Sequence, residues 1–551
     1  MKKTLAFLLC VVMVLVSTVS ALAADVTPNN EYPIVKEKIT LDVFAPAIPT
    51  IIDLNTNEFT VWLEEKTGIH INWITAPQES APEVLNMMLA SGDLPDIILG
   101  VQVSTATEEL YGNAEHMFLP LNDLIANYAP TFKGIMEARP EVKDAITALD
   151  GNIYSLPSIQ DCYHCGYSQK MWINQDWLTK LNLTMPTTTE EFYNVLVAFR
   201  DLDPNGNGKK DEIPLIGAKE NEGWYQSVTG YLLNSFVYDS GVYNQVKDYV
   251  TKDGVVDTSI NKDAYREGLR YLNKLYSEGL IYPDSLTLKY DQVKALALAE
   301  DELVGAAPAG HLGMFLDVVT NPERYRHYTS VAPLKGPEGV QNVTYFPFFP
   351  ITTGEFIITT DNPAPEASMR WADLMYDYET SMIRGWGKEG VAWRKAEDGE
   401  VGLDGVTPAI YKTLIPFDEQ AQNVHWSWLG IEYTDNTLWN GTNVTTPDMD
   451  LYSPEGFEKL LWVETENKYE PYKSEEYSEL PALRMDSLDT DELSMLQVQL
   501  KNYIEESRSR FIIGDLNLDT DWEAYLSTLN DLGLNRYLEL KQKAYDAMFK
   551  K

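Results

Sequence analysis

The chain has 551 residues, of which 44% are apolar and 11% aromatic. This length and composition allow about two to four domains with large buried cores and exclude a disordered chain. Lysine and arginine together number 43, against 83 aspartates and glutamates, so the formal net charge is −40. Because such an acidic surface repels phosphate groups, we expect neither a nucleic-acid partner nor binding to an anionic membrane surface.

The N-terminus has the form of a secretion signal. Two lysines precede the apolar run 5–16, and small residues then provide a site for a signal peptidase. The apolar run is shorter than the ~20 residues of a membrane-spanning helix. We therefore predict a signal peptide over 1–23 that is cleaved after Ala23, a polar tether over 24–37 and an extracytoplasmic location. Cys10 lies inside the apolar run and has no lipid-attachment motif around it.

Signal cleavage leaves Cys162 and Cys165, in the sequence Cys-Tyr-His-Cys, as the cysteines of the mature chain. This spacing suits a local disulfide, two unpaired thiols, or half of a zinc or redox site. Zinc needs four ligands, and the chain has no second cysteine pair. His164 could contribute, but the other histidines are scattered along the sequence. We therefore predict a disulfide or two idle thiols here, and neither a metal nor redox catalysis.

Strand and helix signals alternate in the N-terminal part. Alternating apolar residues predict strands at 39–44 and 69–73, and a short continuous apolar run predicts a buried strand at 96–99. Amphipathic helices are expected between these strands, ending at Gly68 and Gly92. Alternation of this kind predicts a βαβ lobe with parallel strands and right-handed crossovers.

A second α/β unit is predicted to begin near Tyr154, and helical signals dominate from about residue 400 onwards. A capping box, Thr188 with Glu191, marks the start of one of its helices. The expected strands are 167–173, 213–216, 303–307 and 356–358, and the expected helices are 176–181, 189–199, 265–276 and one that starts near 365.

The segment 203–212 has the residue pattern of a calcium-binding loop. Side-chain oxygens recur at alternate positions around Gly208, which permits a tight turn, and Ca²⁺ prefers six to eight oxygen ligands. Position 12 of the loop is Pro214 rather than the acidic residue of an EF-hand, and the following residues indicate a strand. The alternative is a solvated turn without an ion. We predict one structural Ca²⁺ bound by Asp203, Asn205, Asn207, the Lys209 carbonyl, Asp211 and Glu212.

Other catalytic patterns are weak or missing. Residues 385–390 satisfy G-x-G-x-x-G, but a helix signal precedes them, so we interpret them as a helix end and a turn. The sequence contains no H-E-x-x-H, no phosphate-binding loop and no G-x-S-x-G motif.

Several separate motifs resemble those of extracellular solute-binding proteins of sugar ABC transporters, in the subgroup of the alginate-binding and LipO-like proteins. In the N-terminal half they are SGDLPDII (91–98), DGNIYSLP (150–157), MWINQDWL (171–178) and MPTTTEEF (185–192). Near the C-terminus they are FIIG (511–514), DW (521–522), LGL (532–534) and AYD (544–546). Members of this subgroup carry a calcium loop at the position of 203–212. Gram-positive members usually carry a lipid on a cysteine after the leader, and this chain lacks that cysteine.

The resemblance implies a type II periplasmic-binding fold, in which two α/β lobes enclose a ligand cleft and the chain crosses between them more than once. On this basis we assign 38–153 and 300–395 to the first lobe. We assign 154–299 and 396–551 to the second lobe, which includes the calcium loop.

Sugar sites stack aromatic rings against the ligand and bind its hydroxyls with polar side chains in a cleft between domains. Several aromatic residues lie in polar loops without helix or strand spacing, and packing inside a lobe is the alternative for each. The expected ligand-binding residues are Trp224, Tyr225, His311, Tyr345, Trp426 and Trp428. By contrast, Trp62, Trp73, Trp371 and Trp522 have regular spacing, and we expect them in hydrophobic cores.

Two functions fit these features. The first is extracytoplasmic capture of an oligosaccharide by two-lobe closure, without catalysis, and delivery to the membrane permease subunits of an ABC importer. In this case we expect a monomer, and the ligand is a neutral glycan, a uronate oligomer or a peptide. The second is a secreted carbohydrate-active hydrolase, which needs two carboxyl groups about 5–9.5 Å apart in the cleft.

Overall fold

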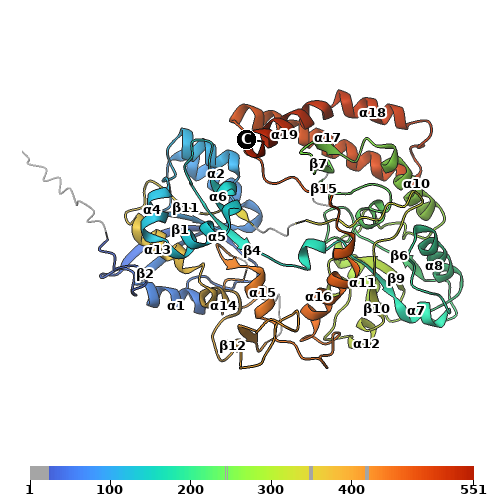
Figure 1. The fold of residues 1–551 in the computed structure, drawn as a ribbon, viewed down its shortest axis with the longest axis horizontal. Coiled ribbons are helices and arrows are strands. Elements are labelled where there is room, and N and C mark those ends of the chain that lie inside the picture. The colour runs from blue at the N-terminus through green and yellow to red at the C-terminus, as the bar shows by residue number, and fades with distance from the viewer. Residues whose placement is uncertain are drawn as a thin grey trace, which may run out of the picture.

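The computed structural model describes residues 24–550 except 242–243, 245, 347–350, 416–420 and 428. The predicted signal peptide and its cleavage site lie outside the described residues. Within the described ranges, no helix is both long enough and apolar enough to cross a membrane. Figure 1 shows two α/β lobes beside each other, in agreement with the predicted fold class.

The first lobe is built on a six-stranded sheet that joins segments far apart in the sequence. In spatial order its strands are β14 (Tyr433–Thr434), β4 (Leu156–Gln160), β11 (Thr352–Ile358), β3 (Ile97–Leu99), β1 (Ile39–Ala47) and β2 (Ile69–Pro77). β1 is parallel to β2 and β3, as the βαβ prediction requires. β11 is antiparallel to β3 and β4, so the sheet is mixed.

Helices cover both faces of this sheet (Figure 1). They are α1 (Glu58–Thr67), α2 (Ala81–Ser91), α3 (Thr105–Glu108), α4 (Asn122–Tyr128), α5 (Pro130–Ala138), α6 (Pro140–Ile146), α13 (Pro365–Leu374), α14 (Tyr378–Trp386) and α15 (Asn436–Gly441). α1 and α2 end at Gly68 and Gly92, which adopt the predicted left-handed conformation. α14 ends at Gly387, so the helix-end interpretation of 385–390 is confirmed.

The second lobe contains a four-stranded sheet of β10 (Tyr328–Val331), β5 (Met171–Asn174), β9 (Val304–Pro308) and β6 (Ile213–Leu215). Its helices include α7 (Gln175–Lys180), α8 (Thr189–Asp201), α9 (Val228–Leu233), α10 (Asp263–Ser277), α11 (Tyr290–Ala297), α12 (Pro322–Tyr325) and α16 (Phe457–Lys468). The capping box of Thr188 and Glu191 is present at the start of α8.

A C-terminal helical unit packs on the second lobe (Figure 1). It consists of α17 (Ser487–Ile513), α18 (Trp522–Asp531) and α19 (Leu534–Phe549), and α17 packs along α10. Two small sheets complete the fold: β15 (Tyr477–Ser478) with β7 (Asp248–Thr251) and β8 (Val256–Thr258), and β12 (Trp393–Lys395) with β13 (Tyr411–Thr413).

The chain changes lobes at places that differ from the predicted boundaries. β4 lies in the first sheet, although its residues were assigned to the second lobe. β9 and β10, which were assigned to the first lobe, pair with β5 in the second sheet. The segment that ends in β14 returns to the first sheet, where β14 pairs with β4. Short apolar runs predict that strands exist, but they do not specify the neighbouring strand.

Each lobe has its own hydrophobic core. Trp371 is buried in the first lobe and Trp522 in the second, as predicted. Trp62 and Trp73 are half-buried and pack against the first core.

Candidate functional site

The loop 203–212 connects the end of α8 to β6 and curls around its own acidic side chains. Both carboxylate oxygens of Asp203 accept hydrogen bonds from the backbone N–H groups of Gly206 and Gly208, each at 3.1 Å. The amides of Asn205 and Asn207 donate to Asp211 at distances of 3.1–3.3 Å.

The predicted ligand side chains of this loop are half-buried, except that of Lys209, whereas Gly206 and Gly208 are exposed. The Lys209 side chain points to Asp301, with Nζ to Oδ2 at 2.5 Å, which leaves its carbonyl as the oxygen it would offer to an ion. Burial, together with the nearby charges of Asp203 and Asp211, raises the pKa of Glu212. The Oε1 atom of Glu212 is buried and has no hydrogen-bond partner among the described residues. Carboxyl and amide groups that converge with an unpaired oxygen fit the donor set of a hard cation such as Ca²⁺.

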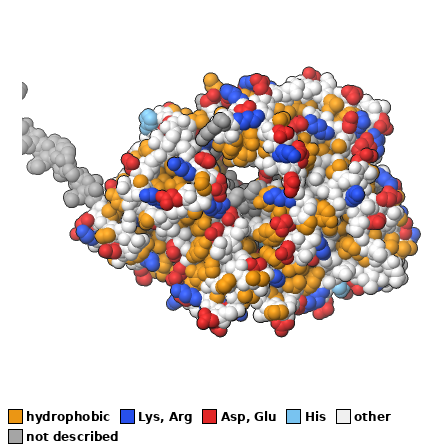
Figure 2. Space-filling view, in the orientation of Figure 1, with side chains coloured by type: hydrophobic (Ala, Val, Ile, Leu, Met, Phe, Trp, Pro, Cys, Tyr) orange, Lys and Arg blue, Asp and Glu red, His pale blue; other side chains and the backbone are white. Residues whose placement is uncertain are grey.

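A second group of residues lies where the two lobes meet. Trp224 and His311 come from loops of the second lobe, and their ring centroids are 5.4 Å apart. Trp439 comes from α15, which follows β14 of the first sheet and lies between the lobes in Figure 1. The ring of His164 lies 6.5 Å from Trp224 and 6.1 Å from Trp439, measured between centroids. We call these four residues the junction cluster. Figure 2 shows that the molecular surface is hollowed between the lobes.

Buried polar atoms in the junction cluster have no hydrogen-bond partner among the described residues. They are Nδ1 of His164, Nδ1 of His311 and Nε1 of Trp439. Oε1 of Gln226, two residues after Trp224, is also buried and has no hydrogen-bond partner among these residues. An unpaired buried polar group costs about 1–3 kcal/mol, so a ligand that supplies hydroxyl groups to these atoms would recover this free energy.

A second aromatic group borders the junction cluster. Tyr345 lies 4.9 Å from Tyr167 between ring centroids, and Nζ of Lys473 lies 3.5 Å from the Tyr345 ring centre. Tyr163, which precedes His164, contacts both Tyr167 and Trp462. The predicted residue Tyr345 is therefore near the lobe junction.

The remaining predicted ligand residues do not present an open aromatic surface at the lobe junction, or lie outside the described residues. Tyr225 is 2% exposed, so its ring is not an open stacking surface. Trp426 is 1% exposed and packs against Phe59, Trp73 and Trp371, and its Nε1 donates to Thr60. The prediction that Trp426 binds the ligand is wrong, because its loop returns to the first lobe and fills that core. Trp428 lies outside the described residues.

No local sequence pattern points to Trp439, Glu458 or His164 as residues of a sugar-binding site. Trp439 lies on the short helix α15, where regular spacing suggests packing inside a lobe rather than ligand binding. The Nε2 atom of His164 lies 2.9 Å from Oε2 of Glu458, which is 294 residues further along the chain. Contacts at this separation leave no local pattern in the sequence.

His164 lies in the turn between Cys162 and Cys165, which form a disulfide. This outcome agrees with one of the two predicted states of the cysteines. The turn contains a 3₁₀ segment (Cys165–Tyr167) rather than the start of the strand predicted from 167. Nζ of the buried Lys170 donates to the carbonyl oxygens of His164 and Tyr167, and these bonds stabilise the turn.

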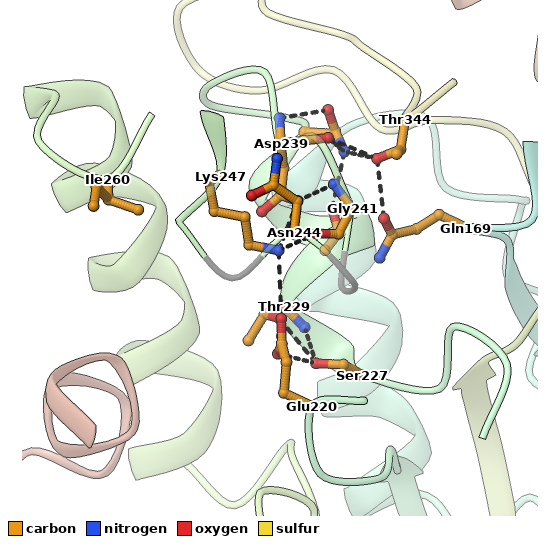
Figure 3. A network of polar contacts seen from close by, with 12 residues as sticks. Gln169, Glu220, Ser227, Thr229, Asp239, Gly241, Asn244, Lys247, Ile260 and Thr344 are labelled. Atoms are coloured by element: carbon orange, nitrogen blue, oxygen red, sulfur yellow. Dashed lines mark hydrogen bonds and ion pairs between the residues drawn. The ribbon is translucent and has the colours of Figure 1, made fainter. Parts of the chain in front are cut away.

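A polar network adjoins the loop that carries Trp224 through Glu220, Ser227 and Thr229 (Figure 3). Glu220 accepts hydrogen bonds from Ser227 and Thr229 at 2.8 and 2.9 Å, which closes the loop that carries Trp224. Nζ of Lys247 lies 3.4 Å from Glu220 and 3.1 Å from Asp239; Lys247 and Asp239 are buried and Glu220 is nearly so. Because opposite charges compensate each other here, the network can hold the loop in one conformation.

Burial and nearby charges together set the pKa values of the ionisable groups around the junction cluster. Burial opposes the ionised form of Glu220, but the cations of Arg508 and Lys247 outweigh burial and lower its pKa to about 2. Burial, reinforced by nearby cationic groups, lowers the pKa of His311 to about 3, so its imidazole is neutral at ordinary pH. Burial also lowers the pKa of Lys170 to about 7.

The chain is similar to known proteins over most of its length. Residues 41–382 match the model of the family described as bacterial extracellular solute-binding protein. The fructooligosaccharide ABC transporter substrate-binding protein FusA of Streptococcus pneumoniae serotype 4 is 29% identical over 520 residues, which cover 93% of this chain and 91% of FusA. The lipoprotein LipO of Bacillus subtilis is 26% identical over 45% of this chain and 46% of its own length.

Solved structures show the same similarity. FusA in complex with kestose has a TM-score of 0.74 at 28% identity and covers 92% of this chain and 99% of FusA. An EF-hand mutant of FusA, in complex with fructo-nystose, has a TM-score of 0.73. An HMO-binding solute-binding protein of Bifidobacterium longum infantis has a TM-score of 0.75 at 23% identity, with 93% and 99% of the two chains covered.

Proposed function

Because the chain belongs to the family of bacterial extracellular solute-binding proteins, we propose that it captures an uncharged oligosaccharide between its two lobes. It then delivers this ligand unchanged to the permease subunits of an ABC importer. The observation that carries the proposal is the junction cluster, in which aromatic rings from both lobes carry buried nitrogen atoms that have no partner in the described part of the chain. The name of the relative FusA, a fructooligosaccharide-binding protein of an ABC transporter, supports an oligosaccharide as ligand.

The charges beside the junction cluster favour an uncharged ligand. A uronate would need a free arginine or lysine to balance its carboxylate. Cations near these rings contact other groups of the protein: Lys473 lies over Tyr345, Lys170 binds the turn, and Lys294, whose charge acts on His311, lies 3.5 Å from the Gly313 carbonyl. The neutral imidazole of His311 and the indole N–H of Trp439 instead match sugar hydroxyl groups.

A melting-temperature screen with a panel of glycans tests this proposal. The panel contains kestose, nystose, neutral human milk oligosaccharides, and alginate and galacturonate oligomers. A ligand that binds only the native state raises the melting temperature by linkage. We expect at least one neutral oligosaccharide to raise it and the uronate oligomers to leave it unchanged. A response to uronates alone would contradict the uncharged-ligand proposal, and cleavage of a glycan during incubation would favour the hydrolase function.

We further propose that the loop 203–212 binds one structural Ca²⁺ through Asp203, Asn205, Asn207, the Lys209 carbonyl, Asp211 and Glu212. The convergent donors support this, as does the Glu212 oxygen that has no partner among the residues that the structure describes. The existence of an EF-hand in FusA supports it as well. When bound, the ion supplies positive charge that balances the loop carboxylates. The loop lies between α8 and β6, so the ion would brace the second lobe rather than contact the ligand.

A further inference from the structure

Three ligand atoms of metal-binding type meet in the turn between β4 and β5. In the part of the chain that the structure describes, one group of three possible metal ligands lies close together. It consists of the Sγ atoms of Cys162 and Cys165 and a ring nitrogen of His164, which all lie within 4.8 Å of one another. All three residues are buried. In the structure the two sulfur atoms are joined as a disulfide, with a distance of 5.2 Å between the Cα atoms.

The structure adds a fourth ligand that the sequence did not reveal. Oε2 of Glu458, on α16, lies 2.9 Å from Nε2 of His164. The same Nε2 atom lies 3.6 Å from Sγ of Cys162 and 4.0 Å from Sγ of Cys165. In a tetrahedral zinc site with bonds of about 2.0–2.3 Å, neighbouring ligand atoms are about 3.3–3.8 Å apart. The contact of His164 with Cys162 falls within this range, the contact with Glu458 is shorter and the contact with Cys165 is slightly longer. Glu458 is not part of the group within 4.8 Å, so it would complete the ligand set through its contact with His164.

We propose that Cys162, His164, Cys165 and Glu458 bind one Zn²⁺ ion when the disulfide is reduced. A dithiol reductant supplies two electrons and two protons, the S–S bond breaks, and the reductant becomes a disulfide. On metal binding each thiol releases its proton to solvent, and the two thiolates, the Nε2 lone pair and one carboxylate oxygen bind the ion. The imidazole proton then resides on Nδ1. Disulfide and zinc are thus alternative states of the same turn.

The ligand set selects the metal and separates this site from the calcium loop. Thiolate and imidazole ligands favour Zn²⁺ over Ca²⁺ and Mg²⁺, which prefer oxygen. The turn also lies directly beside the junction cluster, because His164 belongs to both. The metal state would fix the His164 ring against Trp224 and Trp439. The site joins the crossing between β4 and β5 to α16 of the second lobe.

Cobalt titration of the full chain tests the proposal without any sugar. The protein is reduced with dithiothreitol and freed of reductant by gel filtration under anoxic conditions, and Co²⁺ is then added. We expect one Co²⁺ per reduced chain, with thiolate-to-cobalt charge-transfer absorption and the intense visible bands of a tetrahedral site, both abolished by stoichiometric Zn²⁺. The oxidised protein should show neither feature.

Variants identify the ligands. Cys162→Ser with Cys165→Ser should abolish the absorption, and Glu458→Gln should weaken cobalt binding by about tenfold or more. The matched control is His327→Gln, because His327 forms a similar pair with Glu302 at 2.9 Å without a cysteine nearby, and this variant should bind as the wild type does. The proposal is overturned if the reduced wild type binds no more Co²⁺ than its oxidised form, or if Glu458→Gln binds with full affinity. Because no glycan is used, neither result depends on the proposed function.

Discussion

Trp224 occupies the lobe junction because several local contacts hold its loop there. Its carbonyl accepts a hydrogen bond from the Gly310 N–H at 2.8 Å, and its ring leaves no space for a side chain at Gly310. The nearly buried Glu220 closes the same loop through Ser227 and Thr229. These contacts fix the indole in position before a ligand arrives, which reduces the ordering cost of binding.

Replacement of Trp224 by alanine should therefore weaken sugar binding. Stacking contributes roughly 0.5–1.5 kcal/mol per ring beyond the buried area, so we expect a loss of several-fold or more in affinity for the neutral oligosaccharide found in the screen, measured by calorimetric titration. Trp62→Ala is the matched control, because Trp62 is a half-buried tryptophan that packs on the first core. Equal affinities of Trp224→Ala and wild type would place the sugar elsewhere.

The burial of Glu355 leads to a separate prediction about how the stability of the fold depends on pH. Burial raises the pKa of this β11 carboxyl to about 8, although a hydrogen bond to Gln102 and the charge of Arg384 oppose the shift. The unfolded chain ionises near the usual value of 4.5. Glu355 therefore contributes full stability below pH 4.5, and this contribution is lost as the pH rises through 8.

Glu355→Gln should remove that dependence. Relative to wild type, the variant should gain a few degrees of melting temperature at about pH 8 and little or nothing at about pH 5. Glu65→Gln changes an exposed carboxyl and should leave both values unchanged. A variant that is less stable than wild type at the higher pH would show that the carboxylate is ionised and well solvated in the folded state.

Residue roles were predictable where a local pattern encodes them. Trp224 and Trp426 both lie in polar loops, and the sequence could not distinguish them. Their fates differ because the second loop packs on Phe59 and Trp73, more than 300 residues earlier in the chain. His164 and Glu458 meet for a similar long-range reason.

At the scale of elements, the calcium loop is the feature that the sequence predicts most directly, since its donors lie within ten residues. If Ca²⁺ binds the native loop only, it stabilises the folded state in proportion to the logarithm of its concentration above the dissociation constant. We expect EDTA to lower the melting temperature and Ca²⁺ to restore it.

The double variant Asp203→Ala with Asp211→Ala should abolish the effect of EDTA. Asp253→Ala removes an exposed carboxylate from a turn elsewhere and should respond to EDTA as the wild type does. Identical melting curves of the wild-type protein with and without Ca²⁺ would refute a structural role for the ion.

Element ends and element partners differ in how far the sequence determines them. Gly68, Gly92 and the capping box of Thr188 mark helix ends through backbone geometry that acts over a few residues. The neighbours of β4 and β9 were assigned to the wrong lobes, because a buried strand pairs by packing and by chain path. A run of apolar residues specifies neither the packing partner of the strand nor the path of the chain.

At the scale of the whole molecule, Arg484 connects the C-terminal unit to the first lobe. Its guanidinium lies 3.0 Å from Glu108 and donates to the Ala145 carbonyl at 2.9 Å, while its backbone N–H contacts Met548 of α19. Both Arg484 and Glu108 are buried. Burial raises the pKa of Glu108 against the opposing charge of Arg484, so the pair is held in a poorly solvated environment.

Arg484→Met should lower the free energy of unfolding by about 3–5 kcal/mol, because it leaves a buried charge without its partner. The double variant Arg484→Met with Glu108→Gln removes both charges of this pair and should recover part of this loss, as measured by urea unfolding. The recovery is partial because Glu109, whose Oε1 lies 3.7 Å from Arg484, also loses its partner. A double variant no more stable than Arg484→Met alone would show that the charges do not interact across this interface.

The central claim is capture by closure of two lobes around an unmodified sugar, and small-angle X-ray scattering tests it most directly. The radius of gyration is measured with and without a saturating amount of the neutral oligosaccharide that gives the largest melting shift. The recovered sugar is then analysed by mass spectrometry. The account predicts a smaller radius for the complex than for the free protein, and an intact sugar. An unchanged radius for the wild-type complex, or a cleaved sugar, would contradict it.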